Sequence, residues 1–476
     1  MSDQTLDTTG ARPPVHYRIV SLIVASGLFM EMFDATVLAT ALPTMARDFD
    51  VAPQDMSIAL TSYLLSLAVF IPASGKMADR FGAKTVFRAA MLLFVVSSIL
   101  CSLAPSLADL VGARLLQGFA GAMMVPVGRL VILRSVPRRH MVDATSWLLV
   151  PSLLGPMLGP PVGGFITTYL DWRWIFYINI PIGILGFIAA TLFIEDMEGD
   201  KATRFDLAGF LFSGASLGCL LFGFEMASRP EEALAAAALI GAGTLSGLVY
   251  LRHARGHPAP ILDTTLMHIP SFRKAMIAGS LTRITQGAQP FLLPLMFQVG
   301  FGWSAAASGQ LLLATSLGAI AMKVFAPRLI RRFGFRATLV ANGVLASGGY
   351  AACAFFAPGW PVALIFATLM AAGLFMSLQF TAYNTVAYDR VEPHRLSAAA
   401  SFYTTFQQLM LSLGICIGAL SLSVSMLVAG RDGPALADFS HAFLAVTAIS
   451  LAATIWNLKF TASDGADMRG GRTEAD

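Results

Sequence analysis

Residues 75–84 read GKMADRFGAK and form a basic turn between two long apolar runs. Residues 327–336 read PRLIRRFGFR, and they too stand between two long apolar runs. Each turn has Phe-Gly with a basic residue two positions after the glycine, and the turns lie 252 positions apart. This spacing predicts two copies of one structural unit in the same orientation. Arg331 stands where the first copy has Asp79, so the two turns are not chemically equivalent.

The composition indicates the surroundings in which these runs fold. The chain has 476 residues, of which 56% are hydrophobic and 13% are charged, about half of the ~25% charged share of a soluble domain. The mean hydropathy is +0.69. These values exclude a soluble enzyme, a secreted module and a disordered chain, and they predict an all-α polytopic membrane protein. The basic residues recur in short clusters rather than in one patch, which excludes a nucleic-acid partner.

Fourteen apolar runs are long enough to cross a bilayer as helices. They lie at roughly 18–43, 57–76, 85–104, 107–133, 142–168, 173–194, 207–227, 231–252, 272–297, 304–326, 337–357, 361–388, 396–428 and 438–459. With the amino terminus in the cytosol, 24 Lys or Arg fall on the cytosolic side, four on the opposite side and four within spans. This asymmetry predicts fourteen spans with both ends cytosolic. The first run is too long for a cleaved signal peptide, and we expect it to stay as the first span.

The repeat and the span count divide the chain into five parts. They are a cytosolic tail at 1–17, a six-helix half at 18–195, two inserted spans at 205–253, a second six-helix half at 272–460 and a cytosolic tail at 461–476. Halves in the same orientation imply a pseudo-two-fold axis along the membrane normal. Transporters of this plan bind substrate between the halves, near the bilayer midplane.

Four further segments give the sequence a family resemblance. They read FDATVLATALP at 33–43, ARLLQGFAGAMMVPVGR at 113–129, GPMLGPPVGG at 155–164 and DWRWIFYINIPIG at 171–183. Together with the turn at 75–84, they make the sequence resemble the fourteen-span drug:proton antiporters of the major facilitator superfamily, the EmrB/QacA type. The resemblance covers nearly the whole chain. It implies the major facilitator fold, with two six-helix halves plus two inserted helices.

The resemblance assigns two motifs. The cytosolic gate motif comprises Gly75, Asp79, Arg80, Gly82 and Lys84. Its carboxylate can accept hydrogen bonds at a helix start or pair with arginines across the interface between the halves, as a latch of the outward-facing state. The antiporter motif comprises Gly155, Pro156, Gly159, Pro160, Gly163 and Gly164. Its small residues and prolines predict a bent fifth span that packs closely at the same interface.

Charged residues within the spans need a reason, because each costs about 2.5–3.5 kcal/mol at the centre of a helix. Glu31 and Asp34 lie three residues apart in the first span, so we expect them to share one face. Arg114 and Gln117 in the fourth span fall at the depth of Asp34. We therefore predict a proton-coupling site of Asp34, Glu31 and Arg114. Structural packing is the alternative role for either carboxylate.

Polar, aromatic and methionine residues at similar depth make up the predicted substrate cavity. Its members are Met30, Gln117, Met123, Arg283, Gln286, Gln379, Tyr383, Asn384, Phe402 and Gln407. Arg283, the pseudo-symmetric counterpart of Glu31, can pair with Glu31 or hold an anionic group. The polar members can equally form interhelical hydrogen bonds, and the methionines can be membrane core.

Three charges near span ends are given simpler roles. We expect Arg129 and Lys323 to extend toward the cytosolic surface, and we expect Glu225, near the outer end of the seventh span, to be solvated.

The expected function is proton-driven export. The sequence lacks the phosphate-binding loop G-x-x-x-x-G-K-[ST], so ATP cannot drive transport directly. The four cysteines form no C-x-x-C pair and the seven histidines show no ligand spacing, so we expect no cofactor and no metal. The spans contain no nucleophile–base pair or paired metal-ligating groups, which argues against an intramembrane enzyme.

We therefore expect a proton-coupled exporter of amphiphilic drugs or other small toxic molecules, in the bacterial inner membrane and driven by the proton gradient. Its partners are the substrate, protons and the lipid bilayer, and we expect a monomer. One alternative is an exporter of an organic anion or a metal chelate of the citrate or siderophore type. A remote alternative is a transport-inactive sensor or scaffold.

Overall fold

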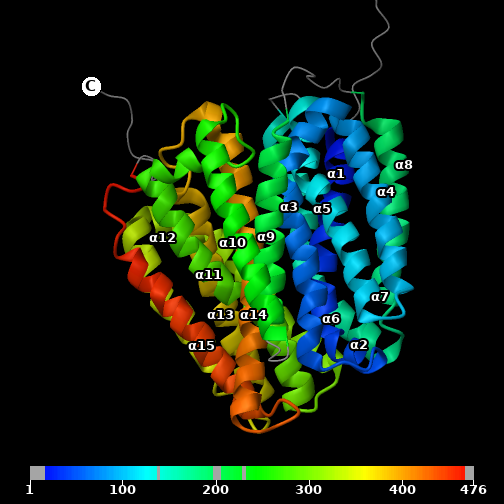
Figure 1. Ribbon diagram of the computed structural model, residues 1–476, viewed down its shortest axis with the longest axis vertical. Coiled ribbons are helices and arrows are strands. Elements are labelled where there is room, and N and C mark those ends of the chain that lie inside the picture. The colour runs from blue at the N-terminus through cyan, green and yellow to red at the C-terminus, as the bar shows by residue number, and fades with distance from the viewer. Residues whose placement is uncertain (1–16, 137–139, 197–204, 228–231, 467–476) are drawn as a thin grey trace, which may run out of the picture.

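The computed structural model describes residues 17–136, 140–196, 205–227 and 232–466, and they form an all-helical bundle. Twelve helices in these residues are long and apolar enough to cross a membrane. Both ends of the described chain lie at one end of the bundle, which we call the termini face (Figure 1). The opposite end, where the second long helix begins, is called the far face. The tail at 1–17 lies almost wholly outside the described residues.

The N-terminal half is built around its first helix, which packs against three others of the same half. Its long helices are α1 (Tyr17–Val37), α3 (Ser57–Phe81), α4 (Ala83–Ser102), α5 (Leu107–Ser135), α6 (Met141–Tyr169) and α8 (Asn179–Phe193). Short turns of helix lie at the far face. They are η1 (Leu38–Thr40), α2 (Leu42–Asp48), η2 (Pro53–Met56) and α7 (Trp174–Tyr177).

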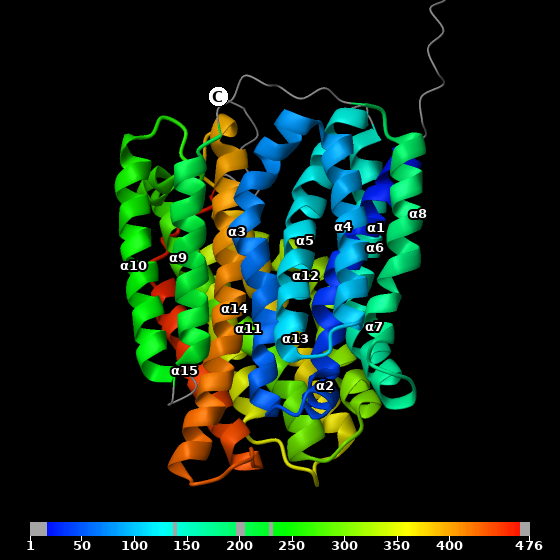
Figure 2. The same cartoon turned by 45° about the vertical axis from the view of Figure 1, so that its right-hand side comes forward.

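Two helices are inserted between the halves, α9 (Leu207–Met226) and α10 (Ala233–Gly256). They pack closely on each other because Gly243 leaves room for the backbone of α9. Of the two, α9 contacts α3 of one half and α14 of the other. Figure 2 shows the pair on the outside of the bundle, beside α3 and α14.

The C-terminal half repeats the six-helix plan. Its elements are η5 (Thr264–His268), α11 (Pro270–Leu295), the π-helical η6 (Met296–Gly300), α12 (Ala305–Cys353), α13 (Val362–Val386), η7 (Pro393–Arg395), α14 (Leu396–Val428) and α15 (Leu436–Asn457). The 49-residue α12 holds two expected spans, because its backbone leaves helical geometry at Gly334. α11 holds another expected span but is absent from the twelve.

The two basic turns share one backbone feature. Gly82 has φ 86° and Gly334 has φ 77°, a left-handed region that favours glycine because it has no Cβ. The two glycines lie 252 positions apart, at matching places in the repeat. The Phe-Gly pair recurs in the sequence because each half needs this turn between its second and third helices.

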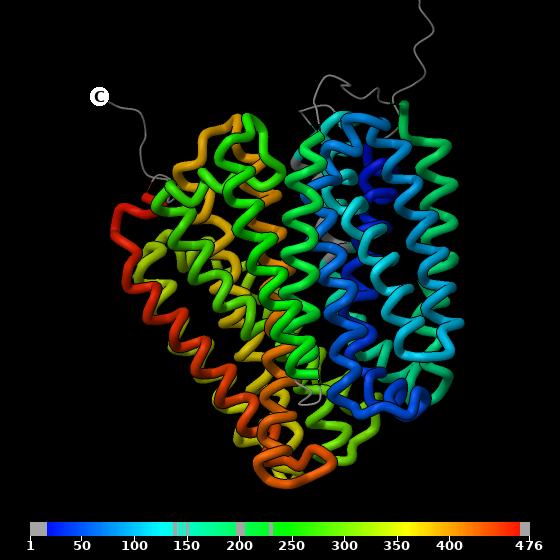
Figure 3. Tube along the Cα trace, in the orientation of Figure 1, coloured from blue at the N-terminus to red at the C-terminus, as the bar shows by residue number. Residues whose placement is uncertain are grey.

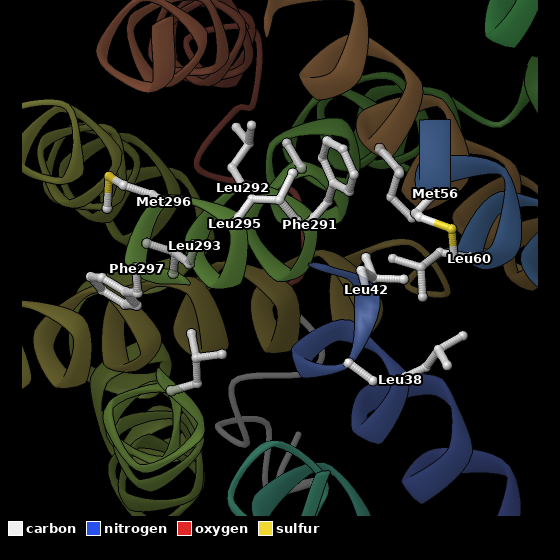
Figure 4. Close-up of a cluster of buried hydrophobic side chains, with 14 of the residues drawn as sticks. Leu38, Leu42, Met56, Leu60, Phe291, Leu292, Leu293, Leu295, Met296 and Phe297 are labelled. Atoms are coloured by element: carbon white, nitrogen blue, oxygen red, sulfur yellow. The ribbon is translucent and has the colours of Figure 1, made fainter. Parts of the chain in front are cut away.

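The two halves meet at the far face. One hydrophobic cluster combines residues of both, with Leu38, Leu42, Met56 and Leu60 on one side and α11–η6 on the other (Figure 4). Of the two clusters nearer the termini face, one belongs to the N-terminal half, and the other joins the C-terminal half to Tyr250 and Ala254 of the inserted helix α10. Figure 3 shows the C-terminal helices slanting toward the N-terminal half as they run to the far face. The bundle is therefore closed at the far face.

Hydrogen bonds between the halves follow the same division. Gln298 Nε2 donates to the Thr40 carbonyl oxygen at 2.9 Å, and Ala306 N donates to Thr168 Oγ1 at 2.9 Å. The others join Ser316 to the Pro156 carbonyl oxygen at 3.0 Å and Ser412 to the Thr61 carbonyl oxygen at 3.2 Å. All four lie between the middle of the bundle and the far face, so the described residues include no such bond toward the termini face.

Candidate functional site

A buried ion pair is the centre of the candidate site. Arg114 of α5 and Asp34 of α1 pair through Nη1 and Oδ2, and both side chains are 0% exposed. Arg114 Nε also donates to the carbonyl oxygen of Ala59 on α3 at 3.1 Å. A lone buried charge would cost several kcal/mol, about the amount lost when one partner of a buried pair is removed. The depth match expected from the sequence therefore corresponds to a direct contact.

Amides complete the surroundings of the Asp34 carboxylate. Gln117 Nε2 donates to Asp34 Oδ1 at 2.9 Å, and Asn179 Nδ2 of α8 donates to the same oxygen at 3.1 Å. Gln117 Oε1 accepts from Arg114 at 2.6 Å, while Gln117 Nε2 also reaches Ser98 of α4 at 3.0 Å. Two helices, α5 and α8, thus hold the Asp34 carboxylate by direct hydrogen bonds inside the N-terminal half, and Ser98 of α4 joins the network through Gln117.

Glu31 lies beside this network but outside it. Its side chain is 3% exposed, and Oε2 has no hydrogen-bond partner. The Tyr63 ring lies under the Arg114 guanidinium, 4.4 Å from its carbon, and the Tyr63 hydroxyl also has no partner. Gly121 of α5 faces both the Tyr63 hydroxyl and the Glu31 side chain. Tyr63 therefore lies between the ion pair and Glu31, so the two acids of α1 have different neighbours instead of one shared site.

A second group of charges lies in the C-terminal half. Arg283, midway along α11 and 7% exposed, donates from Nη1 to Gln286 Oε1 at 2.7 Å. Its guanidinium carbon lies 3.7 Å from the Phe380 ring centre, and Nη2 has no partner. Lys323 Nζ of α12 lies 5.3 Å from the same ring. Arg283 and Glu31, one of the two possible pairings considered for Arg283, form no ion pair among the described residues. The Lys323 side chain is exposed, and its Nζ lies on the side of Phe380.

Four residues expected in the cavity lie elsewhere, inside single halves. Met30 and Met123 are buried in the core of the N-terminal half, where Met30 packs on Gly183. Gln379 accepts from Asn342 at 2.8 Å, and Tyr383 donates to Asn457 at 2.7 Å. In this structure these four side chains are therefore buried within single halves rather than between them, since helices that are apolar on nearly every side do not reveal which face is turned inward. The alternative of interhelical hydrogen bonds holds for Gln379 and Tyr383.

The remaining cavity candidates lie on α13 and α14. Gln407 Nε2 donates to Asn384 Oδ1 at 2.8 Å, and both side chains are half-buried. Phe402 is buried and stacks on Phe406, with ring centres 4.8 Å apart. These residues link two helices of the C-terminal half.

The gate motif is engaged within its own half. Asp79 pairs with Arg134 of α5 at 3.3 Å, and Lys84 pairs with Asp196 at 3.3 Å. Arg80 lies over the ring of Phe81, and Gly75 has open space around it. In this structure the arginine that pairs with Asp79 comes from α5 of the same half rather than from the other half.

The antiporter motif packs α6 on two neighbours. A Cβ on Gly155, Gly159 or Gly163 would meet α1, with the closest atom at 2.9, 2.1 and 2.3 Å respectively. A Cβ on Gly164 would lie 2.2 Å from the Ala305 carbonyl oxygen of α12. The glycine seam thus faces α1 within one half, while Gly164 and the prolines reach the other half. The fifth span thus contacts the other half through α12, whereas most of the glycine seam expected at that interface packs on α1.

Glu225 corrects another expectation. It was expected to be solvated, but it is 6% exposed near the end of α9. Its Oε1 accepts from Ser57 Oγ at the start of α3, and its Oε2 accepts from Cys416 Sγ of α14 at 3.1 Å. Because α9 packs against α3 and α14, the end of this helix is covered, and its carboxylate links the inserted pair to both halves.

Two histidines also lie closer to an acid than the sequence indicated. Asp206, His253 and His257 bring their ligand atoms within 4.8 Å of one another. Asp206 also accepts from Gly209 N at 2.9 Å, and His257 Nδ1 accepts from Ala259 N at 3.2 Å. His253 Nε2 lies 2.7 Å from Asp206 Oδ1, and this hydrogen bond ties the start of α9 to the end of α10.

Sequence reasoning missed several participants, namely Tyr63, Ser98, Asn179 and Phe380. Asn179 lies inside the quoted segment at 171–183, and it is the polar residue of an apolar helix start. The polar Asn179 at the start of an apolar helix could therefore have been predicted as a member of the site. Tyr63 and Phe380 carry no such mark, because aromatic residues are common throughout these spans.

A helical bundle of two similar halves, with charges buried in helices that can cross a membrane, defines a polytopic membrane transporter. The Major Facilitator Superfamily pattern matches residues 24–415, with a second match at 277–464. The chain belongs to the Major Facilitator Superfamily.

Relatives and solved structures agree with this family. The chain is 33% identical over 455 residues to the "Probable transport protein HsrA" of Haemophilus influenzae, which covers 95% of this chain and 98% of that protein. It is 35% identical over 448 residues to the "Putative multidrug resistance protein MdtD" of Pectobacterium atrosepticum, with 93% and 96% covered. A crystal structure of a D-xylose-proton symporter shares the fold, with a TM-score of 0.66, 15% identity and 93% and 97% covered.

Proposed function

We propose that this transporter is a proton-coupled exporter of small amphiphilic molecules in the bacterial inner membrane. The observation that carries the proposal is the Asp34–Arg114 pair buried in spanning helices, beside a Glu31 oxygen without a partner. Acids inside membrane helices mark proton or ion pathways. Relatives at about 35% identity carry multidrug resistance names, which supports export.

We further propose fourteen spans of the drug:proton antiporter type, with both ends in the cytosol. The twelve long apolar helices become fourteen when α12 is divided at Gly334 and α11 is added. The 24-to-4 distribution of basic residues supports cytosolic ends. The termini face is then the cytosolic face, and the closed far face makes this the inward-facing state.

Tyr63 provides a physical route for coupling in this proposal. A proton on Asp34 would weaken its bond to Arg114, because the neutral acid loses the charge attraction. The freed guanidinium would shift on the Tyr63 ring, and Tyr63 reaches the space beside Glu31. Protonation of Asp34 and binding of substrate then affect each other through this connected set of side chains, so that each weakens the binding of the other, as reciprocal linkage requires.

Inverted membrane vesicles with an acid lumen test this proposal. The wild type should accumulate a fluorescent amphiphile in the lumen while protons leave, as read with a lumenal pH dye. Asp34→Asn should abolish accumulation and proton release together, whereas the exposed carboxylate control Glu392→Gln should retain both. Proton release by Asp34→Asn at the wild-type rate would move the coupling role to Glu31. Absence of uptake by the wild type would favour the transport-inactive sensor or scaffold.

A second substrate class is favoured by a specific observation. Arg283 and Lys323 have no acid within ion-pair distance among the described residues. An exporter of an organic anion or metal chelate would use such cations. This possibility can be separated from export of cationic drugs by the charge of the ligand that the site binds.

A further inference from the structure

We propose that the ligand carries an anionic group, of the carboxylate class, that binds Arg283 and Lys323 beside Phe380. This inference rests on the proposed export function and specifies its substrate as an anionic amphiphile. The geometry that points to it is a pair of cations from two helices on one aromatic ring, 3.7 Å and 5.3 Å from its centre.

The Arg283 guanidinium is incompletely satisfied. The Arg283 side chain is only 7% exposed, and its Nη1 donates a hydrogen bond to Gln286 Oε1. Its Nη2 is buried without a hydrogen-bond partner. A buried guanidinium without an acid is costly, because desolvation is not repaid by charge attraction. The Phe380 ring offsets part of this cost. Because the ring accepts no conventional hydrogen bond from Nη2, that N–H group remains available to a hydrogen-bond acceptor of a bound ligand.

Lys323 adds a second positive charge toward the other half. Gly309, Ser316 and Lys323 are spaced seven residues apart on α12, so they share a helix face. Gly309 packs on Pro160 of α6, and Ser316 bonds to the Pro156 carbonyl oxygen of the same helix. The face of α12 that carries Lys323 is therefore the face turned to the N-terminal half.

The unpaired charges within the spanning helices favour an anion over a cation. Glu31 is a buried acid of α1 that has no ion-pair partner among the described residues, and it lies seven residues before Leu38, whose side chain joins the cluster between the halves. Two cations, Arg283 and Lys323, lie at the Phe380 ring and have no ion-pair partner among the described residues, so they outnumber this acid. Asp34 contributes no unpaired charge, because it is neutralised by Arg114.

The shape of the group that fits follows from these contacts. A carboxylate can accept from Arg283 Nη2 with one oxygen and from Lys323 Nζ with the other, since Arg and Lys donate and cannot accept. The ring of Phe380 offers an apolar surface next to the charge. An aromatic carboxylate therefore matches the site better than its neutral amide or an aromatic amine.

Binding to the purified full-length protein, without any pH gradient, tests the inference. The probes are 2-naphthoate, 2-naphthamide and 2-naphthylmethylammonium, measured by calorimetry in lipid nanodiscs. We expect the wild type to bind the carboxylate most tightly, and Arg283→Gln to weaken that binding about tenfold or more. Arg283→Lys should restore part of the loss, and Lys323→Gln should weaken the carboxylate selectively.

The matched control is Arg273→Gln, which removes an exposed arginine from the same helix and should leave all three affinities unchanged. Tighter wild-type binding of the amine, no binding of any probe, or an equal loss for all three probes in Arg283→Gln would overturn the inference. A protein that binds 2-naphthoate through Arg283 but moves no protons in vesicles would contradict only the proposed function.

Discussion

Replacing Gly309 by alanine should open the far face of the transporter. An added Cβ would lie 2.1 Å from the Pro160 carbonyl oxygen and 2.9 Å from its carbon. Ordinary contacts begin near 3.4 Å, so α12 must withdraw from α6 by about 1 Å in a densely packed interface. Both contacting atoms are backbone, which cannot rotate away.

The magnitude follows from overpacking. Such insertions cost about 1–3 kcal/mol, and the cost applies to the state in which α6 and α12 touch at the far face. If the opposite state separates them there, the equilibrium between the two shifts by roughly 5–150-fold. Gly348→Ala is the matched control, because it lies in the same α12 and has no atom within 4 Å of an added Cβ.

Labelling from outside the cell measures this shift. Leu292 is 0% exposed in the cluster that closes the far face, and Leu292→Cys provides a reporter in a Cys219→Ser background. A membrane-impermeant maleimide should label the reporter faster by the predicted factor in Gly309→Ala and at the unchanged rate in Gly348→Ala. Equal labelling in both variants, with normal folded yield, would refute the assignment of this seam as the closing contact.

Three further outcomes are expected. Asp79→Ala should leave the protein inserted but cripple export in a drug-survival assay; undiminished export at normal expression would count against the latch. Glu225→Ala should expose its partner Cys416, seen as faster maleimide labelling, while buried Cys353 stays protected; unchanged labelling of Cys416 would contradict the bridging role. Burial raises the pKa of Asp206, but hydrogen bonds from Gly209 N, His253 and Ile261 N outweigh it and hold the pKa below its usual value. The stabilisation is therefore fully present above about pH 4 and is lost below it, so Asp206→Asn should lower the thermal midpoint at neutral pH, and an unchanged midpoint would show that the link is dispensable.

The sequence located the ion pair because depth is a one-dimensional quantity. Asp34 and Arg114 fall at equal depth when helix rise is counted from the span ends, and the cost of a membrane-buried charge requires a partner. The turn glycines Gly82 and Gly334 could also be predicted from the sequence. The same Phe-Gly pair occurs in both repeats, because each turn requires a backbone conformation that favours glycine.

Facing directions were harder to predict. Met30, Met123, Gln379 and Tyr383 occupy helices that are apolar on nearly every side, so no periodicity separates the interior of a half from the space between halves. Glu225 was wrongly predicted to be solvated. Its burial depends on how the inserted helices pack against α3 and α14, and the number of spans gives no information about that packing.

The most direct test of proton coupling uses liposomes without an imposed pH gradient. The protein is reconstituted with an aromatic carboxylate on one side and a pH dye inside. The account predicts that the substrate gradient moves protons in the opposite direction in the wild type, and that Asp34→Asn abolishes this movement while Glu392→Gln preserves it. Substrate flux by the wild type with no change in lumenal pH would contradict proton-coupled transport.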